Sequence, residues 1–168
     1  MSEIKVRSAK TSDVDFMTSL IAIYAPKRSM LKKEIITLYE DVQEFVIAER
    51  DGSPVGYGAL HVLWEDLAEV RSVAVHPDFK RQGVGAAVVE ALLVRAKELG
   101  IRRVFCLTFE DKFFSKFGFL PTSGPLVEHD VYSQMLKSED EGVAEFLDLE
   151  RVKPNTLGNI RMLLMLPN

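Results

Sequence analysis

Apolar and polar side chains alternate with different periods along this chain, and each period predicts one kind of element. Three segments repeat apolar residues every three or four positions, the spacing of one face of a helix. They are Val14, Met17, Ile21 and Tyr24; Ile35, Leu38, Tyr39 and Val42; and Val88, Leu92, Ala96 and Leu99. Ser12 with Asp15 fits a capping box before the first helix, and Gly100 suits the C-terminal cap of the third. Two shorter helices are predicted at 113–117 and 131–137.

Segments rich in β-branched and aromatic residues predict strands at 4–8, 45–49, 55–62, 69–75, 103–108, 144–149 and 160–166. Asp51-Gly52 forms a hairpin turn between the second and third strands, so this pair should be antiparallel. The strand–helix–strand unit around 69–108 should be a right-handed parallel crossover. A mixed sheet covered by helices follows, and the fold class is α/β or α+β.

Composition narrows the class of protein. A length of 168 residues suits one domain, which we expect to span 1–168. The net charge of −4 argues against a general nucleic-acid binder. No apolar run approaches the roughly 20 residues that cross a bilayer, and the N-terminus lacks a secretory apolar region. With Cys106 as the single cysteine, these features predict a soluble cytoplasmic protein with no membrane partner.

A basic, glycine-containing turn joins the strand at 69–75 to the third helix, and it reads Lys80-Arg81-Gln82-Gly83-Val84-Gly85-Ala86. The start of a helix offers backbone N–H groups with no internal partner, and the helix dipole adds positive charge there. Glycines let a diphosphate approach the backbone. The turn therefore predicts an anion site. The alternative is a tight turn beneath a solvated basic pair.

Two motifs resemble those of the GNAT superfamily of N-acetyltransferases. "VRSVAVHPDFKRQGVGAAVVEALL" resembles the acetyl-CoA motif, Gln/Arg-x-x-Gly-x-Gly/Ala, with Lys80 in the first place. "FFSKFGF" resembles the second motif, F-Y-x-x-x-G-F. The resemblance implies the GNAT acyl-CoA N-acyltransferase fold, which has a mixed, mostly antiparallel central sheet with a parallel, splayed strand pair, flanked by helices.

The same resemblance implies acetyl-CoA as co-substrate. Backbone groups of Val73 and Val75 would pair with the pantetheine arm like an added strand. Backbone amides of the turn would hold the diphosphate. The implied cofactor-binding residues are Val73, Ala74, Val75, Lys80, Arg81, Gln82, Gly83, Val84, Gly85 and Ala86. We expect no metal, because His61, His76 and His129 carry no metal-ligand spacing.

Four further stretches resemble the short, single-domain N-acetylglutamate synthases. They are "LKKEIITLYEDVQEFVIAE", "GALHVLWEDLAEVRSVAVHP", "VFCLTFEDKFF" and "VAEFLDLERVKPNTLGNIRMLLML". The resemblance implies acetylation of L-glutamate for arginine synthesis, with arginine as a candidate inhibitor. Two alternatives stay open: an acetyltransferase for another amino acid, a polyamine or a protein N-terminus, and a non-catalytic acyl-CoA sensor. A terminal strand could also pair two copies into a homodimer.

Cationic residues are candidates for binding the two carboxylates of glutamate, because carboxylates need charged or N–H-rich anchors. By resemblance the substrate-binding residues are Lys32, Lys33, Arg71, Ser72 and Arg161. Alternatively, the lysine pair forms a solvated face. Arg161 interrupts an apolar strand and could instead protect a sheet edge from aggregation.

The amine must lose a proton before it attacks a thioester, and Glu69 is the candidate base. On a regular strand Glu69 shares a face with Arg71, Val73 and Val75. Its alternative is a solvent-facing carboxylate. The Val73 region could supply an N–H to the developing oxyanion. The usual tyrosine of the second motif is Phe114 here. By resemblance to related synthases, Thr108 is the candidate donor to the leaving thiolate, unless its hydroxyl serves its own backbone. Alternatively, the thiol leaves with help from water alone. We expect direct attack, without an acetyl-enzyme.

Overall fold

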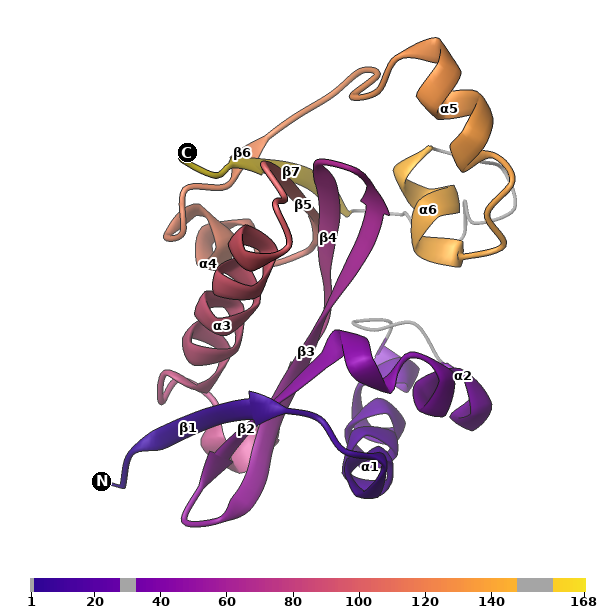
Figure 1. Ribbon diagram of the computed structural model, residues 1–168. Helices are drawn as coiled ribbons and strands as arrows, with labels where there is room; N and C mark the ends of the chain where they lie inside the picture. The colour runs from indigo at the N-terminus through magenta and orange to yellow at the C-terminus, as the bar shows by residue number, and fades with distance from the viewer. Residues whose placement is uncertain (1, 28–32, 148–158) are drawn as a thin grey trace. The chain divides into compact units, whose positions relative to one another are not determined.

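The computed structural model describes residues 2–27, 33–147 and 159–168 (Figure 1). Its helices are α1 (Val14–Tyr24), α2 (Ile35–Glu40), α3 (Val84–Glu98), α4 (Asp111–Ser115), α5 (His129–Met135) and α6 (Glu141–Phe146). Its strands are β1 (Ile4–Ser8), β2 (Phe45–Arg50), β3 (Ser53–Trp64), β4 (Leu67–Val75), β5 (Arg103–Thr108), β6 (Leu120–Pro121) and β7 (Ile160–Met165). Short 3-10 turns include η1 (Thr11–Asp13), η3 (Val42–Glu44) and η4 (Pro77–Phe79).

The strands form a seven-stranded sheet in the order β1-β2-β3-β4-β5-β7-β6. β2 is antiparallel to β1 and β3, and β7 is antiparallel to β5 and β6. β4 and β5 are parallel, and Glu69 lies opposite Phe105 in their ladder. The predicted mixed, mostly antiparallel sheet with one parallel pair is confirmed. The chain groups into two compact units, Met1–His61 with Val70–Leu99 and Val62–Glu69 with Gly100–Asn168.

In the first unit, helices pack on both faces of β3. Side chains on one face of this strand enter a core, and glycines alternate with them on the other face. Tyr57 and Ala59 are fully buried in a core with residues of α1 and α2. Gly56 and Gly58 face α3 instead: a Cβ on Gly58 would lie 2.6 Å from Cγ1 of Val88. The two glycines therefore let α3 pack directly on the sheet. Figure 1 shows β3 passing between α3 and the α1–α2 pair.

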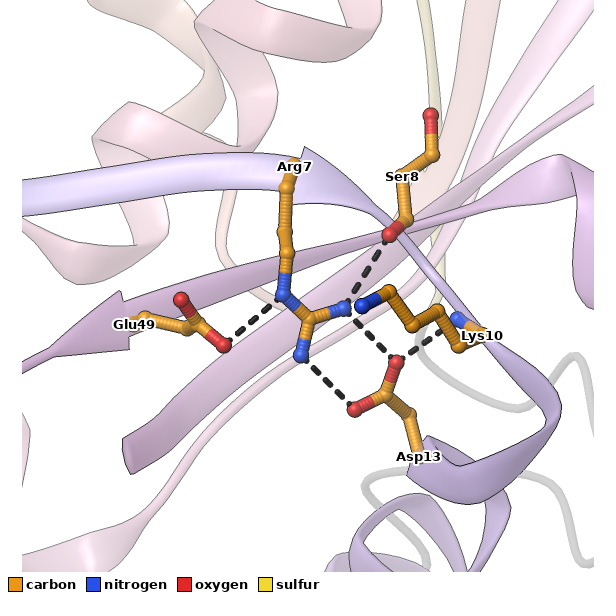
Figure 2. A network of polar contacts seen from close by, with 5 residues as sticks. All are labelled: Arg7, Ser8, Lys10, Asp13 and Glu49. Atoms are coloured by element: carbon orange, nitrogen blue, oxygen red, sulfur yellow. Dashed lines mark hydrogen bonds and ion pairs between the residues drawn. The ribbon is translucent and has the colours of Figure 1, made fainter. Parts of the chain in front are cut away.

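A polar network fixes the start of α1 (Figure 2). The Arg7 guanidinium donates to both carboxylate oxygens of Asp13, at 2.8 and 2.9 Å, and to Glu49 at 2.7 Å. Asp13, only 5% exposed, also accepts the Lys10 N–H at 2.7 Å. The predicted Ser12–Asp15 capping box is therefore wrong: the chain enters α1 through η1, Asp13 bonds the Lys10 N–H at the start of η1, and the N-cap of α1 has no side-chain cap bond.

The second unit has its own apolar core, formed by Leu67, Phe105, Met135, Val143 and Phe146. The rings of Phe105 and Phe146 lie 4.6 Å apart, centroid to centroid. The strand predicted at 144–149 is wrong, because α6 occupies Glu141–Phe146. The Asp140 carboxylate accepts the Val143 N–H at 3.1 Å, which is the bond of a helix N-cap. Positions 148 and 149 lie outside the described residues.

Most other helices and strands begin and end within two or three residues of the predicted positions. The predicted helices at 113–117 and 131–137 begin two residues earlier, as α4 and α5. Gly100 has φ +84°, the left-handed conformation expected of the residue that follows a helix. β6 was not predicted, and at two residues it is too short for a periodic signal. Within the described ranges, none of the helices combines the length and apolar character needed to cross a membrane.

Candidate functional site

The turn that precedes α3 contains backbone amides that have no partner within the helix. Gly83 is the N-cap, with φ +86° and ψ 1°, and Arg81 has φ +60°. The Ala87 N–H bonds to the Gly83 carbonyl at 3.0 Å, as the first hydrogen bond of the helix. The amides of Val84, Gly85 and Ala86 precede that bond, so no carbonyl of the helix accepts them. These are amides that the sequence assigned to a diphosphate.

The charge and accessibility of this turn fit a diphosphate. Lys80, Arg81 and Gly83 are exposed, and the dipole of the 15-residue α3 points its positive end at the turn. A side chain at position 83 would be strained by the left-handed backbone. The turn can therefore hold an anion against main-chain N–H groups, with two cationic side chains beside it.

The carboxyl end of β4 is fixed by Tyr24. Its hydroxyl donates to the Val75 carbonyl at 2.5 Å, and the Lys80 ammonium lies 4.8 Å from the centroid of its ring. The His76 N–H bonds to Val55 of β3 at 2.8 Å, so the Val75 N–H points to the other edge of β4. Because Tyr24 engages the carbonyl, the N–H of Val75 is the group suited to a pantetheine arm.

Ser72 reverses the faces of β4. Its φ of +57° lies in the left-handed region, which breaks the two-residue alternation of a strand. Arg71 contacts Glu44 on the α2 side, whereas Val73 packs near Gly58 on the α3 side. The expectation that Glu69, Arg71, Val73 and Val75 share one face is therefore wrong.

A charged cluster surrounds Arg71 in the first unit, and sequence reasoning missed most of it. Glu44 accepts from Arg71 at 3.4 Å, and its other oxygen lies 2.5 Å from Nδ1 of His61. Burial, with the nearby charge of Glu44, raises the pKa of Asp41 above its ordinary value. Lys33, 5.9 Å from the Phe45 ring centroid, adds a positive charge that opposes this rise. Lys32 lies outside the described residues.

Glu69 is buried in the second unit. Its exposed fraction is 4%, so the alternative of a solvent-facing carboxylate is wrong. Cys106 lies nearby. Burial, and secondarily the negative charge of Glu69, raise the pKa of its thiol. Glu69 is thus a carboxylate inside the fold, opposite Phe105 in the parallel ladder, and its role as general base stays a prediction.

Thr108 and Phe114 lie near the carboxyl end of β5 and in α4. The Thr108 hydroxyl oxygen accepts the Glu110 N–H at 2.8 Å, as its alternative interpretation expected. This bond uses the oxygen as an acceptor and leaves the hydroxyl proton available as a donor. Phe114 is 6% exposed and packs edge-on against Phe113 and Phe119, so an apolar ring fills the place of the usual tyrosine.

Arg161 lies in an internal strand, since β7 is placed between β5 and β6. Protection of a sheet edge is therefore the wrong explanation for its charge. Its guanidinium donates to the carbonyls of Phe146 at 3.1 Å and Gly124 at 2.7 Å. These bonds account for a structural role, and the predicted contact with a substrate carboxylate stays a prediction.

No group of three or more His, Cys, Asp or Glu side chains in the described part of the chain is arranged to hold a metal ion. The predicted residues instead form two groups. One, in the first unit, contains the turn, Val73–Val75 and the cluster around Arg71. The other, in the second unit, contains Glu69, Thr108 and Arg161. β4 runs continuously through both Glu69 and Val75.

Comparisons with known proteins identify the family of this chain. A family model described as "Acetyltransferase (GNAT) family" matches residues 15–119. A Mycobacterium tuberculosis protein named "Amino-acid acetyltransferase" is 52% identical over 164 residues, covering 96% of this chain and 94% of that protein.

Two solved structures share the fold. A Mycobacterium tuberculosis structure "in complex with CoA and NLQ" superposes with a TM-score of 0.94 at 51% identity, covering 97% of this chain and 99% of that one. N-acetylglutamate synthase of Neisseria gonorrhoeae, "complexed with coenzyme A and N-acetyl-glutamate", has a TM-score of 0.79 at 20% identity. That match covers all of this chain but 36% of the other, and it bears on the fold alone.

Proposed function

Because this chain belongs to the GNAT family of acetyltransferases, we propose that it transfers the acetyl group of acetyl-CoA to the α-amino group of L-glutamate. The product would be N-acetyl-L-glutamate, and the reaction would begin arginine synthesis. The observation that carries the proposal is β4, which bears a buried carboxylate at Glu69 and leads at its carboxyl end into a turn whose main-chain amides and cationic side chains suit an anion.

The diphosphate of acetyl-CoA would lie against the amides of Val84, Gly85 and Ala86, with Lys80 and Arg81 beside it. Val73 and the Val75 N–H would pair with the pantetheine arm. When bound, acetyl-CoA supplies an activated thioester carbonyl. The protein's contribution is then to position that carbonyl and to manage one proton and one developing negative charge.

Glu69 would accept the proton of the incoming ammonium, directly or through one water, because only the neutral amine attacks a carbonyl. An N–H near Val73 would stabilise negative charge as it develops on the carbonyl oxygen. Thr108 would donate its hydroxyl proton in a hydrogen bond to the departing sulfur. Phe114 has no proton to give, so the family's tyrosine cannot take part in this chain.

Glutamate as the acceptor is supported by the cationic residues and by the amino-acid acetyltransferase at 52% identity. Arg71, Lys33 and Arg161 would bind its carboxylates, with the Ser72 backbone and Lys32 as further candidates. A dicarboxylate needs at least two such anchors. The Glu44–Arg71 contact is long, at 3.4 Å, so a substrate carboxylate could replace it as the closer partner of the guanidinium.

A second candidate is an acetyltransferase for an amine with less negative charge. The observation that favours it is the pair of carboxylates, Asp41 and Glu44, in the cluster around Arg71. Their charge would repel the side chain of glutamate and tolerate an uncharged or cationic one.

One assay separates the two candidates. The purified protein is given acetyl-CoA and a panel of L-glutamate, L-glutamine, other amino acids, spermidine and a peptide, and the release of free thiol is followed. Preference for L-glutamate supports the proposal. Activity confined to spermidine or the peptide rejects it, and equal activity with uncharged amino acids supports the second candidate. Added arginine tests for feedback inhibition in the same experiment.

A further inference from the structure

Arg50, at the end of β2, reaches the turn that precedes α3. Its guanidinium donates to the side-chain oxygen of Gln82. The amide nitrogen of Gln82 donates in turn to the Asp78 carbonyl at 3.1 Å. The carboxamide group of Gln82 is therefore fixed by two hydrogen bonds, one to β2 and one to the residues that lead into the turn.

The turn needs such support because its backbone is strained. Arg81 has φ +60° although it is not glycine, and Gly83 follows with φ +86°. A left-handed conformation at a residue with a Cβ persists only where the surroundings impose it. Gln82 lies between these two residues, so its anchored side chain holds the stretch whose amides would meet a diphosphate.

Arg50 is itself held in place. It is the last residue of β2, and Asp51 and Gly52 follow it with φ of 52° and 77° in a tight hairpin turn. Its guanidinium carbon lies 5.8 Å from the centroid of the Phe79 ring. Its Nε is buried with no hydrogen-bond partner among the described residues. Burying an unsatisfied donor is unfavourable, which indicates that other contacts of Arg50 hold it there.

We propose that Arg50 is a positioning residue for the diphosphate, acting through Gln82 on the turn at 80–86. The inference rests on the proposed function, since it assumes that coenzyme A binds at this turn. Arg50 does not touch the reacting atoms. It fixes the conformation of the turn that contains the amides of Val84, Gly85 and Ala86. Its loss should therefore weaken binding of the cofactor more than it lowers the rate at saturating substrate.

Calorimetry with coenzyme A tests the coupling, using Arg50→Ala, Gln82→Ala and the double variant. Each single variant should raise the Kd about tenfold, the scale of one hydrogen bond to a charged group. The Kd of the double variant should be no higher than that of the single variants, because both changes remove the same Arg50–Gln82 hydrogen bond. In steady-state assays Arg50→Ala should raise the KM for acetyl-CoA while kcat and the KM for the amine change less than twofold.

Arg95→Ala is the matched control, because Arg95 belongs to the same compact unit and donates to the Gln43 carbonyl from α3. It should leave the Kd for coenzyme A unchanged. Arg50→Met keeps an unbranched side chain of similar length but removes the donors: if methionine retains full affinity, the bond to Gln82 is not the cause. An unchanged Kd in Arg50→Ala, or additive losses in the double variant, overturns the inference. Absence of coenzyme A binding in the unaltered protein would reject the proposed function itself.

Discussion

Replacement of Asp13 by Asn tests whether the network at the start of α1 stabilises the fold. Asn keeps the size of the side chain and an oxygen for the Lys10 N–H, but it removes the negative charge that faces Arg7. In the folded protein that charge accepts two guanidinium bonds, at 2.8 and 2.9 Å. The change therefore isolates the ionic part of the network.

The magnitude follows from burial. Breaking one partner of a fully buried ion pair costs about 3–5 kcal/mol. The Asp13 side chain is 6% exposed, but that of Arg7 is 30% exposed and keeps its bond to Glu49. Solvent therefore screens part of the loss, and we expect about 2 kcal/mol. In a protein of this size that corresponds to a fall in Tm of about 4–8 °C.

The pH dependence has a definite sign. Hydrogen bonding from Arg7 holds the pKa of Asp13 below its ordinary value of 3.8. A depressed pKa gives stability that is complete above the ordinary value and is lost as the pH falls through the folded value. Asn cannot titrate, so the difference in stability between the two proteins should narrow only in that acidic window. The Asp66 carboxylate, whose pKa Arg103 also lowers, is common to both proteins and cancels.

Urea unfolding, followed by circular dichroism at neutral pH and at successively lower values, measures this difference. Asp15→Asn is the control, since Asp15 is an exposed acid in the first turn of α1; it should change stability by about 0.5 kcal/mol or less. A loss in Asp13→Asn as small as that of the control would refute the reasoning. So would a large loss that persists undiminished to the acid limit of folding.

Three further predictions concern packing and the candidate site. Gly58→Ala places a Cβ 2.6 Å from Val88 and should destabilise the protein by about 1–3 kcal/mol in urea unfolding; an unchanged midpoint would mean that α3 is not seated on that glycine. Glu69→Gln should lower kcat about 100-fold or more with the Kd for coenzyme A retained, and an unchanged rate would remove it as the base. Arg161→Ala should raise the KM for L-glutamate far more than that for acetyl-CoA, and equal changes in both would leave Arg161 with only its bonds to Phe146 and Gly124.

Periodicity predicted the regular elements well, because their side chains are divided between a buried and a solvated side. The hairpin at Asp51-Gly52 and the parallel pairing of β4 with β5 follow directly from local signals and chain order. The segment after Val143 has the pattern of a strand, because four apolar residues stand close together in positions 144–149. The cue that was overlooked is Asp140, which caps α6 through the Val143 N–H.

The candidate site was less predictable where it depends on tertiary contacts. The turn could be read from its glycines and charges, but neither the left-handed conformation of Arg81 nor the bond between Arg50 and Gln82 leaves a local signal. His61 looked isolated in the sequence because its partner, Glu44, is 17 residues away. Burial of Glu69 was likewise invisible, since a lone glutamate at a strand start more often faces water.

The twist at Ser72 divides β4 into two parts that can vary separately. Under the proposed function, substitutions before this residue would change the surroundings of Arg71 and thereby the choice of amine. Substitutions after it would change how Val73 and Val75 pair with the acyl donor. A change of acceptor would then leave binding of the acyl donor intact, whereas a deletion within the strand would disturb both at once.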